Sequence, residues 1–164
     1  MTLKSADPNT MENPNLWWSA LTAYLHYLGL MLSFGALGVE VFHLKPEMNL
    51  TEAKRVAFAD IVYGIAAVMI LVTGVLRVLY FGKGSDYYLN NPFFYVKVGI
   101  FVVVGLLSLY PTITFIFWFR DFQKNEVPKL DTSKAQLLSN LIKGELVGFT
   151  LIPLFASIMA RMTL

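Results

Sequence analysis

Four long apolar stretches, separated by short polar segments, dominate the chain. They are free of formally charged residues over residues 16–39, 61–76, 98–119 and 146–160. The first and third exceed the roughly 18 residues expected of a membrane-spanning helix. The other two reach that length when their charged flanks are included, where long side chains can extend to the membrane interface. The pattern therefore predicts four membrane-spanning helices.

Capping residues and helix breakers set the expected helix bounds. We predict helices over residues 16–43, 51–81, 93–122 and 133–162, with Thr51 capping the second and Thr132 or Ser133 the fourth. Residues 1–15 are expected to form a polar N-terminal tail, and residues 16–164 one transmembrane domain. The predicted fold class is all-α, an integral membrane four-helix bundle.

Basic residues indicate how this bundle is oriented. One side of the membrane would carry Lys45, Lys54, Arg55, Arg120, Lys124, Lys129 and Lys134, and the other Lys4, Lys83 and Arg161. Cytoplasmic loops of membrane proteins are enriched in lysine and arginine. Both termini are therefore predicted on the extracytoplasmic side.

Composition narrows the function classes. Of the 164 residues, 56% are hydrophobic and 15% aromatic, and the mean hydropathy is +0.58, which is more apolar than a soluble domain needs. The net charge of +2 is spread over loops, so we expect membrane lipids and no nucleic acid as partners. The sequence has no cysteine, which excludes disulfides, thiolate metal sites and cysteine nucleophiles.

Small and polar residues recur on one face of each helix. In the first helix one sector collects Ser19, Thr22, His26, Gly29, Ser33, Ala36 and Glu40. The predicted polar seam of the bundle consists of Ser33, Glu40, Asp60, Tyr63, Ser108 and Glu145. Such residues ordinarily pack helices and hydrogen-bond between them. For the carboxylates, pairing with Lys54, Arg55 or Lys143 is expected.

His26, Arg77 and Lys97 are candidates for a binding site. His26 lies roughly 15 Å from the outer end of its helix, close to mid-bilayer, and Arg77 and Lys97 lie roughly 9 Å above it. One interpretation is that the two cations extend to the headgroups and His26 bonds a neighbouring Tyr or Ser. In the other, His26 ligates a b-type haem iron and the two cations bind its propionates, with Met69 as a second axial ligand.

A stretch in the middle of the chain carries a family resemblance. It reads ADIVYGIAAVMILVTGVLRVLYFGKGSDYYLNNPFFYVKVGIFVVVGLLSLYPTI. The matching residues are Asp60, Tyr63, Gly64, Gly74, Arg77, Gly84, Tyr88, Asn91, Pro92, Lys97, Gly105, Ser108, Pro111 and Thr112, with His26, Glu145 and Pro153 outside the stretch. These residues resemble an uncharacterised bacterial family, domain-of-unknown-function family 2214. The resemblance implies a multi-pass protein of the bacterial inner (cytoplasmic) membrane without an assigned activity.

A more distant resemblance is to the HemJ-type membrane protoporphyrinogen oxidases and the CopD-type membrane domains. HemJ-type proteins have four helices, bind b-type haem and depend on a histidine in the first helix and a lysine early in the third. His26 and Lys97 match those positions, which implies a haem-dependent membrane oxidoreductase. The alternative is a non-enzymatic, oligomeric membrane scaffold or small transporter with an anion or lipid-phosphate site.

Overall fold

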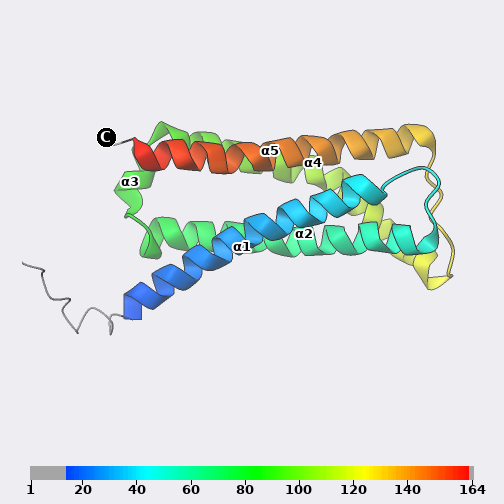
Figure 1. Ribbon diagram of the computed structural model, residues 1–164, viewed down its shortest axis with the longest axis horizontal. Helices are drawn as coiled ribbons and strands as arrows, with labels where there is room; N and C mark the ends of the chain where they lie inside the picture. Colours follow the sequence, from blue (N-terminus) through cyan, green and yellow to red (C-terminus); the bar gives the residue numbers. More distant parts are fainter. Residues whose placement is uncertain (1–13, 163–164) are drawn as a thin grey trace, which may run out of the picture.

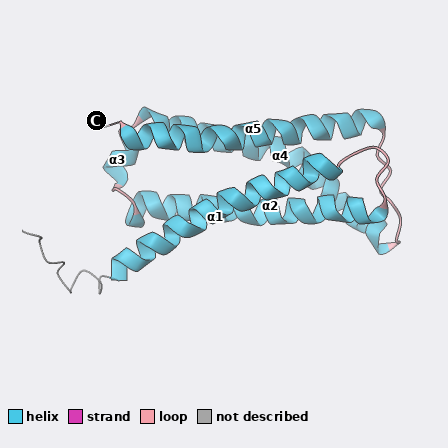
Figure 2. Cartoon of the chain, viewed as in Figure 1, coloured by secondary structure: helices cyan, strands magenta, loops and turns pink. Residues whose placement is uncertain are grey.

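The computed structural model describes residues 14–162, and these form helices joined by loops without any strand (Figures 1 and 2). The long helices are α1 (Pro14–His43), α2 (Leu50–Leu76), α4 (Pro92–Gln123) and α5 (Thr132–Arg161). The all-α fold class is confirmed. The predicted N-terminal tail lies almost wholly outside the described residues.

The four long helices have the length and composition of membrane spans. The candidate spans are Asn15–His43, Leu50–Phe81, Pro92–Gln123 and Thr132–Arg161. In each, 28% or less of the most apolar stretch is buried within the protein, so most of its side chains face outward. An apolar surface of this extent needs acyl chains rather than water around it. Which end faces the cytoplasm stays a prediction.

The helices pack as two antiparallel pairs, α1 with α2 and α4 with α5, joined by contacts of α1 with α5 and of α2 with α4. Two loops, residues 44–49 and 124–131, lie together at what we call the loop end, on the right in Figure 1. Residues 82–91 lie at the opposite, hairpin end.

Fully buried apolar side chains concentrate toward the loop end. Leu37, Val56, Phe115, Leu138 and Phe149 are each 1% exposed or less. Toward the hairpin end, by contrast, α4 has no buried side chain before Val104. The bundle therefore has a tightly packed half at the loop end and a more loosely packed half at the hairpin end.

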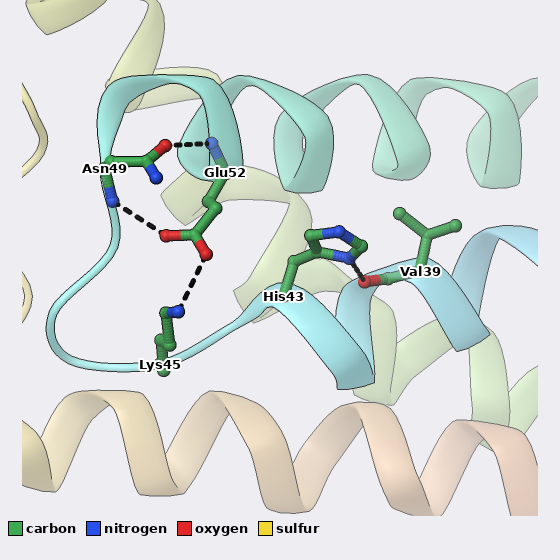
Figure 3. A network of polar contacts seen from close by, with 5 residues as sticks. All are labelled: Val39, His43, Lys45, Asn49 and Glu52. Carbon is green, nitrogen blue, oxygen red and sulfur yellow. Dashed lines mark hydrogen bonds and ion pairs between the residues drawn. The ribbon is translucent and has the colours of Figure 1, made fainter.

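A capping box fixes the start of α2 (Figure 3). The Asn49 side chain accepts from the Glu52 backbone N–H at 2.9 Å, and the Glu52 carboxylate accepts from the Asn49 N–H at 2.9 Å. Lys45 Nζ lies 2.7 Å from the second Glu52 oxygen. Asn49 is therefore the cap, and the expected Thr51 cap is wrong. Likewise Asp131 caps α5 in place of Thr132 or Ser133, because its carboxylate reaches the Lys134 N–H at 2.7 Å.

Two short elements between α2 and α4 differ from the prediction of one continuous helix and a plain turn. The end of the second span is a π-helical turn, η2 (Arg77–Phe81), and the connection contains a short helix, α3 (Ser85–Leu89). Tertiary contacts hold both. Ser19 Oγ donates to the Phe81 carbonyl at 2.7 Å, and the Tyr87 hydroxyl donates to the Met159 carbonyl at 3.0 Å.

Gly148 sets the closest approach of α4 to α5. A Cβ atom at this position would collide with Cγ2 of Val104. At Gly144, one turn earlier on α5, a Cβ would meet Leu107 Cδ1 at an ordinary 3.6 Å. Of these two glycines, Gly148 is thus the one at which a side chain would clash with α4.

Gly148→Ala should destabilise the bundle and Gly144→Ala should not. Overpacking of this kind costs about 1–3 kcal/mol of unfolding free energy, whereas alanine at Gly144 gains helix propensity without a clash. Thermal unfolding of the two variants in detergent, followed by circular dichroism, measures the difference. Equal melting temperatures for both would contradict the close approach.

Candidate functional site

His26 lies on the face of α1 that packs against α2, and its ring is held by Thr73. His26 Nδ1 is 3.0 Å from Thr73 Oγ1. The Thr73 hydroxyl already donates its one hydrogen to the Met69 carbonyl at 2.5 Å, so its oxygen accepts from Nδ1–H. The Ile70 carbonyl lies 3.3 Å from the Thr73 hydroxyl. This carbonyl is a second acceptor for the His26 ring N–H. Nε2 therefore holds the lone pair.

A glycine on α2 makes room for the His26 ring. A Cβ at Gly74 would lie 3.3 Å from Cε1 of His26, which is tighter than most contacts of that kind. Gly74 and Thr73 together therefore set both the position and the tautomer of the imidazole. Neither residue carries charge or ligates metals, so Thr73 could not be recognised from the sequence by its chemistry.

Arg77 and Lys97 join His26 toward the hairpin end. Both are half-buried, both charges act on the His26 ring, and the charge of Arg77 acts on Lys97. The structure thus brings the three predicted basic residues together, and we call this group the basic site.

The basic site contains no carboxylate that neutralises it. Between residues 14 and 162 the sole ion pair is Lys45–Glu52, at the other end of the bundle. Arg77 Cζ instead lies 5.7 Å from the ring centroid of Tyr27, and Lys97 Nζ 5.5 Å from that of Tyr88. Cation–π contacts of this kind contribute roughly 0.5–1 kcal/mol and leave the net charge in place. The arrangement suits an anion.

Met69 lies on α2, one helical turn before Thr73, the residue that bonds His26. Its Cε atom would be 3.3 Å from a Cβ at Gly29, and the Ala66 carbonyl oxygen would be 3.1 Å from the same point. α1 and α2 are therefore in direct contact here, which leaves no space for a porphyrin between His26 and Met69. The residues present fit an anionic ligand held by His26, Arg77 and Lys97, and Met69 is explained as a packing residue.

A second polar cluster, which we call the acidic site, lies toward the loop end. Glu40 of α1 is 1% exposed, Asp60 of α2 is 6% exposed and Glu145 of α5 is 1% exposed. The charges of Asp60 and Glu145 act on Glu40, and that of Asp60 acts on Glu145. The three carboxyl groups thus lie buried on three helices of the tightly packed half, near enough for their charges to interact.

Hydroxyl groups from α2 and α4 connect to these carboxyl groups. Thr112 Oγ1 donates to Asp60 Oδ1 at 2.7 Å. The phenol of Tyr63 is in hydrogen-bonding reach of Ser108 and of Glu145. Of the predicted polar seam, Ser33, Glu40, Asp60, Tyr63 and Glu145 are therefore buried inside the bundle, and Ser108 is half-buried.

The expected pairing of these carboxylates with lysine or arginine is wrong. None of the three is in an ion pair within the described part of the chain. Lys54, Arg55 and Lys143 are exposed. Lys54 and Arg55 line an open groove of about 800 Å³ on the outer surface of α1 and α2, so they point away from the bundle interior.

A family model described as "Predicted membrane protein (DUF2214)" matches residues 18–162. The chain belongs to this DUF2214 family. The match includes both the basic site and the acidic site of this DUF2214 protein. No curated protein and no solved structure matches it. The likeness to HemJ-type and CopD-type proteins stays a prediction.

Thr73→Val should release the His26 ring from its single tautomer. Valine keeps the shape of threonine but removes the oxygen that accepts from Nδ1–H. Nitrogen-15 NMR of histidine-labelled protein should show a protonated Nδ1 and a bare Nε2 in the parent protein, and a mixture in the variant. Thr114→Val is the matched control, because the Thr114 hydroxyl donates to the Tyr110 carbonyl within α4 at 2.9 Å. A parent spectrum with the proton on Nε2 would refute this arrangement.

Proposed function

We propose that this DUF2214 protein binds an anionic ligand within the membrane at the basic site, and that b-type haem is the ligand that engages all three residues. The observation that carries the proposal is the grouping of His26, Arg77 and Lys97 without a carboxylate partner. Leaving such charges unpaired in a membrane is costly, and an anion with two acidic groups would neutralise them.

The orientation of His26 supports an iron ligand. Metal-bound histidines characteristically donate their second ring N–H to a fixed acceptor, which orients the ring and sets the tautomer. His26 meets this condition through Thr73, and its Nε2 lone pair remains for a ligand. Arg77 and Lys97 would bind the propionates through charge-assisted hydrogen bonds. When bound, haem supplies one-electron redox chemistry, and the protein would then act as a membrane oxidoreductase.

The second candidate is a non-enzymatic membrane protein, an oligomeric scaffold or a small transporter, that holds a lipid phosphate at the same place. The position of the two cations favours it. Arg77 begins η2 at the hairpin end and Lys97 lies over the rings of Tyr88 and Phe94 beside α3. Long basic side chains at such helix ends reach lipid headgroups.

A visible absorption spectrum of the detergent-purified protein, expressed with haem supplied, tests the first candidate. A Soret band is expected, and His26→Ala should abolish it. Arg77→Gln and Lys97→Gln should each weaken haem retention about 10-fold or more, because a hydrogen bond to a charged group contributes roughly 1.5–3 kcal/mol. Lys83→Gln is the matched control, since Lys83 is exposed and lies over the Tyr87 ring at 4.6 Å, and should leave the band unchanged.

The absence of a Soret band from the parent protein would refute haem binding. Native mass spectrometry then decides the second candidate. Protein reconstituted with an anionic phospholipid should retain that lipid, and Arg77→Gln with Lys97→Gln should lose it. Equal lipid retention by the parent protein and the double variant would show that the basic site binds no anion.

A further inference from the structure

The acidic site raises a separate question, because three carboxyl groups share one interior without a counter-charge. Moving an ionised carboxylate out of water costs several kcal/mol even after the protein relaxes. Glu40 and Glu145 are both 1% exposed, so water does not stabilise them. Neighbouring like charges add repulsion to this cost.

No basic side chain offsets these charges. Between residues 14 and 162 no lysine, arginine or histidine is in an ion pair with Glu40, Asp60 or Glu145. His26 stands fourteen residues before Glu40 on α1, which is roughly 21 Å away along the helix. The basic site therefore cannot neutralise the acidic site.

Unused oxygen atoms show that the network is incomplete. Glu40 Oε1 and Glu145 Oε1 are fully buried and have no hydrogen-bond partner. An ionised carboxylate accepts hydrogen bonds but cannot donate one, whereas a protonated carboxyl group can do both. A proton on either group therefore removes its charge and adds a hydrogen-bond donor.

A proton explains the site better than a metal ion does. Among the described residues no three His, Asp or Glu side chains are grouped so that they could hold a metal. The core in this half of the bundle is close-packed, with Val56, Leu138, Ile142 and Phe149 all 1% exposed or less. A proton needs no coordination shell, whereas a sodium or calcium ion needs several oxygen ligands around it.

We propose that Glu40, Asp60 and Glu145 form an intramembrane proton-binding site, in which the carboxyl groups carry protons that exchange with water. Thr112 donates a hydrogen bond to Asp60, and the Tyr63 hydroxyl lies close to Glu145 and Ser108. The groups that face the site are Glu40 from α1, Asp60 and Tyr63 from α2, Ser108 and Thr112 from α4, and Glu145 from α5. This function is independent of any ligand at the basic site.

Infrared spectroscopy of the full-length protein in lipid vesicles, at neutral pH, tests the proposal. The C=O stretch of protonated carboxylic acids should be present and should shift when H₂O is replaced by D₂O. Glu40→Gln, Asp60→Asn and Glu145→Gln should each remove or alter part of this band. Glu126→Gln is the matched control, because Glu126 is exposed in the loop of residues 124–131 and should leave the band intact.

Thr112→Val provides a second test in case the carboxyl variants fail to fold, because it leaves all three carboxyl groups in place. Loss of the 2.7 Å hydrogen bond to Asp60 Oδ1 should move one component of the band to higher frequency. The absence of a protonated-carboxyl band in the parent protein would overturn the proposal. A band that sodium or calcium ions abolish at constant pH would assign the site to a metal cation, and would overturn it equally.

Discussion

Burial of like charges without counter-charges is the constraint on which this bundle depends. Hydrocarbon offers no hydrogen bonds, so each polar group inside must find its partner within the protein. Here His26, Arg77 and Lys97 lie toward the hairpin end and Glu40, Asp60 and Glu145 toward the loop end, and none of these six is in an ion pair in the described chain. Each cluster therefore lacks a counter-charge, which is the basis on which we propose an anion for one and protons for the other.

The packing of the helices keeps the two clusters apart. Close contacts at Gly29 and Gly148 bring α1 onto α2 and α4 onto α5, which makes two firm pairs. Between the pairs the core is dense at the loop end and sparse at the hairpin end. The acidic site lies in the dense half, where Glu40, Asp60 and Glu145 are buried. The basic site lies in the sparse half, where Arg77 and Lys97 are half-buried.

The helices were predictable because lipid imposes a simple requirement. A spanning helix needs an uninterrupted apolar stretch, and the four stretches of this chain correspond to the four long helices. The helix ends were less predictable. Thr51 and Asn49 are both residue types that cap helices well, and Asn49 caps α2 because Glu52 forms the reciprocal hydrogen bond with it. The π-helical turn at Arg77 was beyond prediction, because its sequence suits an α-helix equally well.

The sequence showed which residues belong to the candidate sites, but not which side chains contact one another there. Helical spacing placed His26 and Glu40 on one face of the first helix, since that face is small and polar throughout. Spacing could not show that Thr73 orients His26, or that Lys54 points to the outer surface instead of toward Asp60. Those relations depend on how one helix rotates against its neighbour, and Gly29 and Gly74 set that rotation through side-chain contacts.

The most direct test of the central claim, that buried carboxyl groups here are neutralised by protons, is a neutron diffraction structure of the deuterium-exchanged protein. Deuterium density is expected on at least one oxygen of Glu40, Asp60 or Glu145, with no cation among them. Bare oxygens on all three, with a metal ion or a lysine side chain between them, would contradict it.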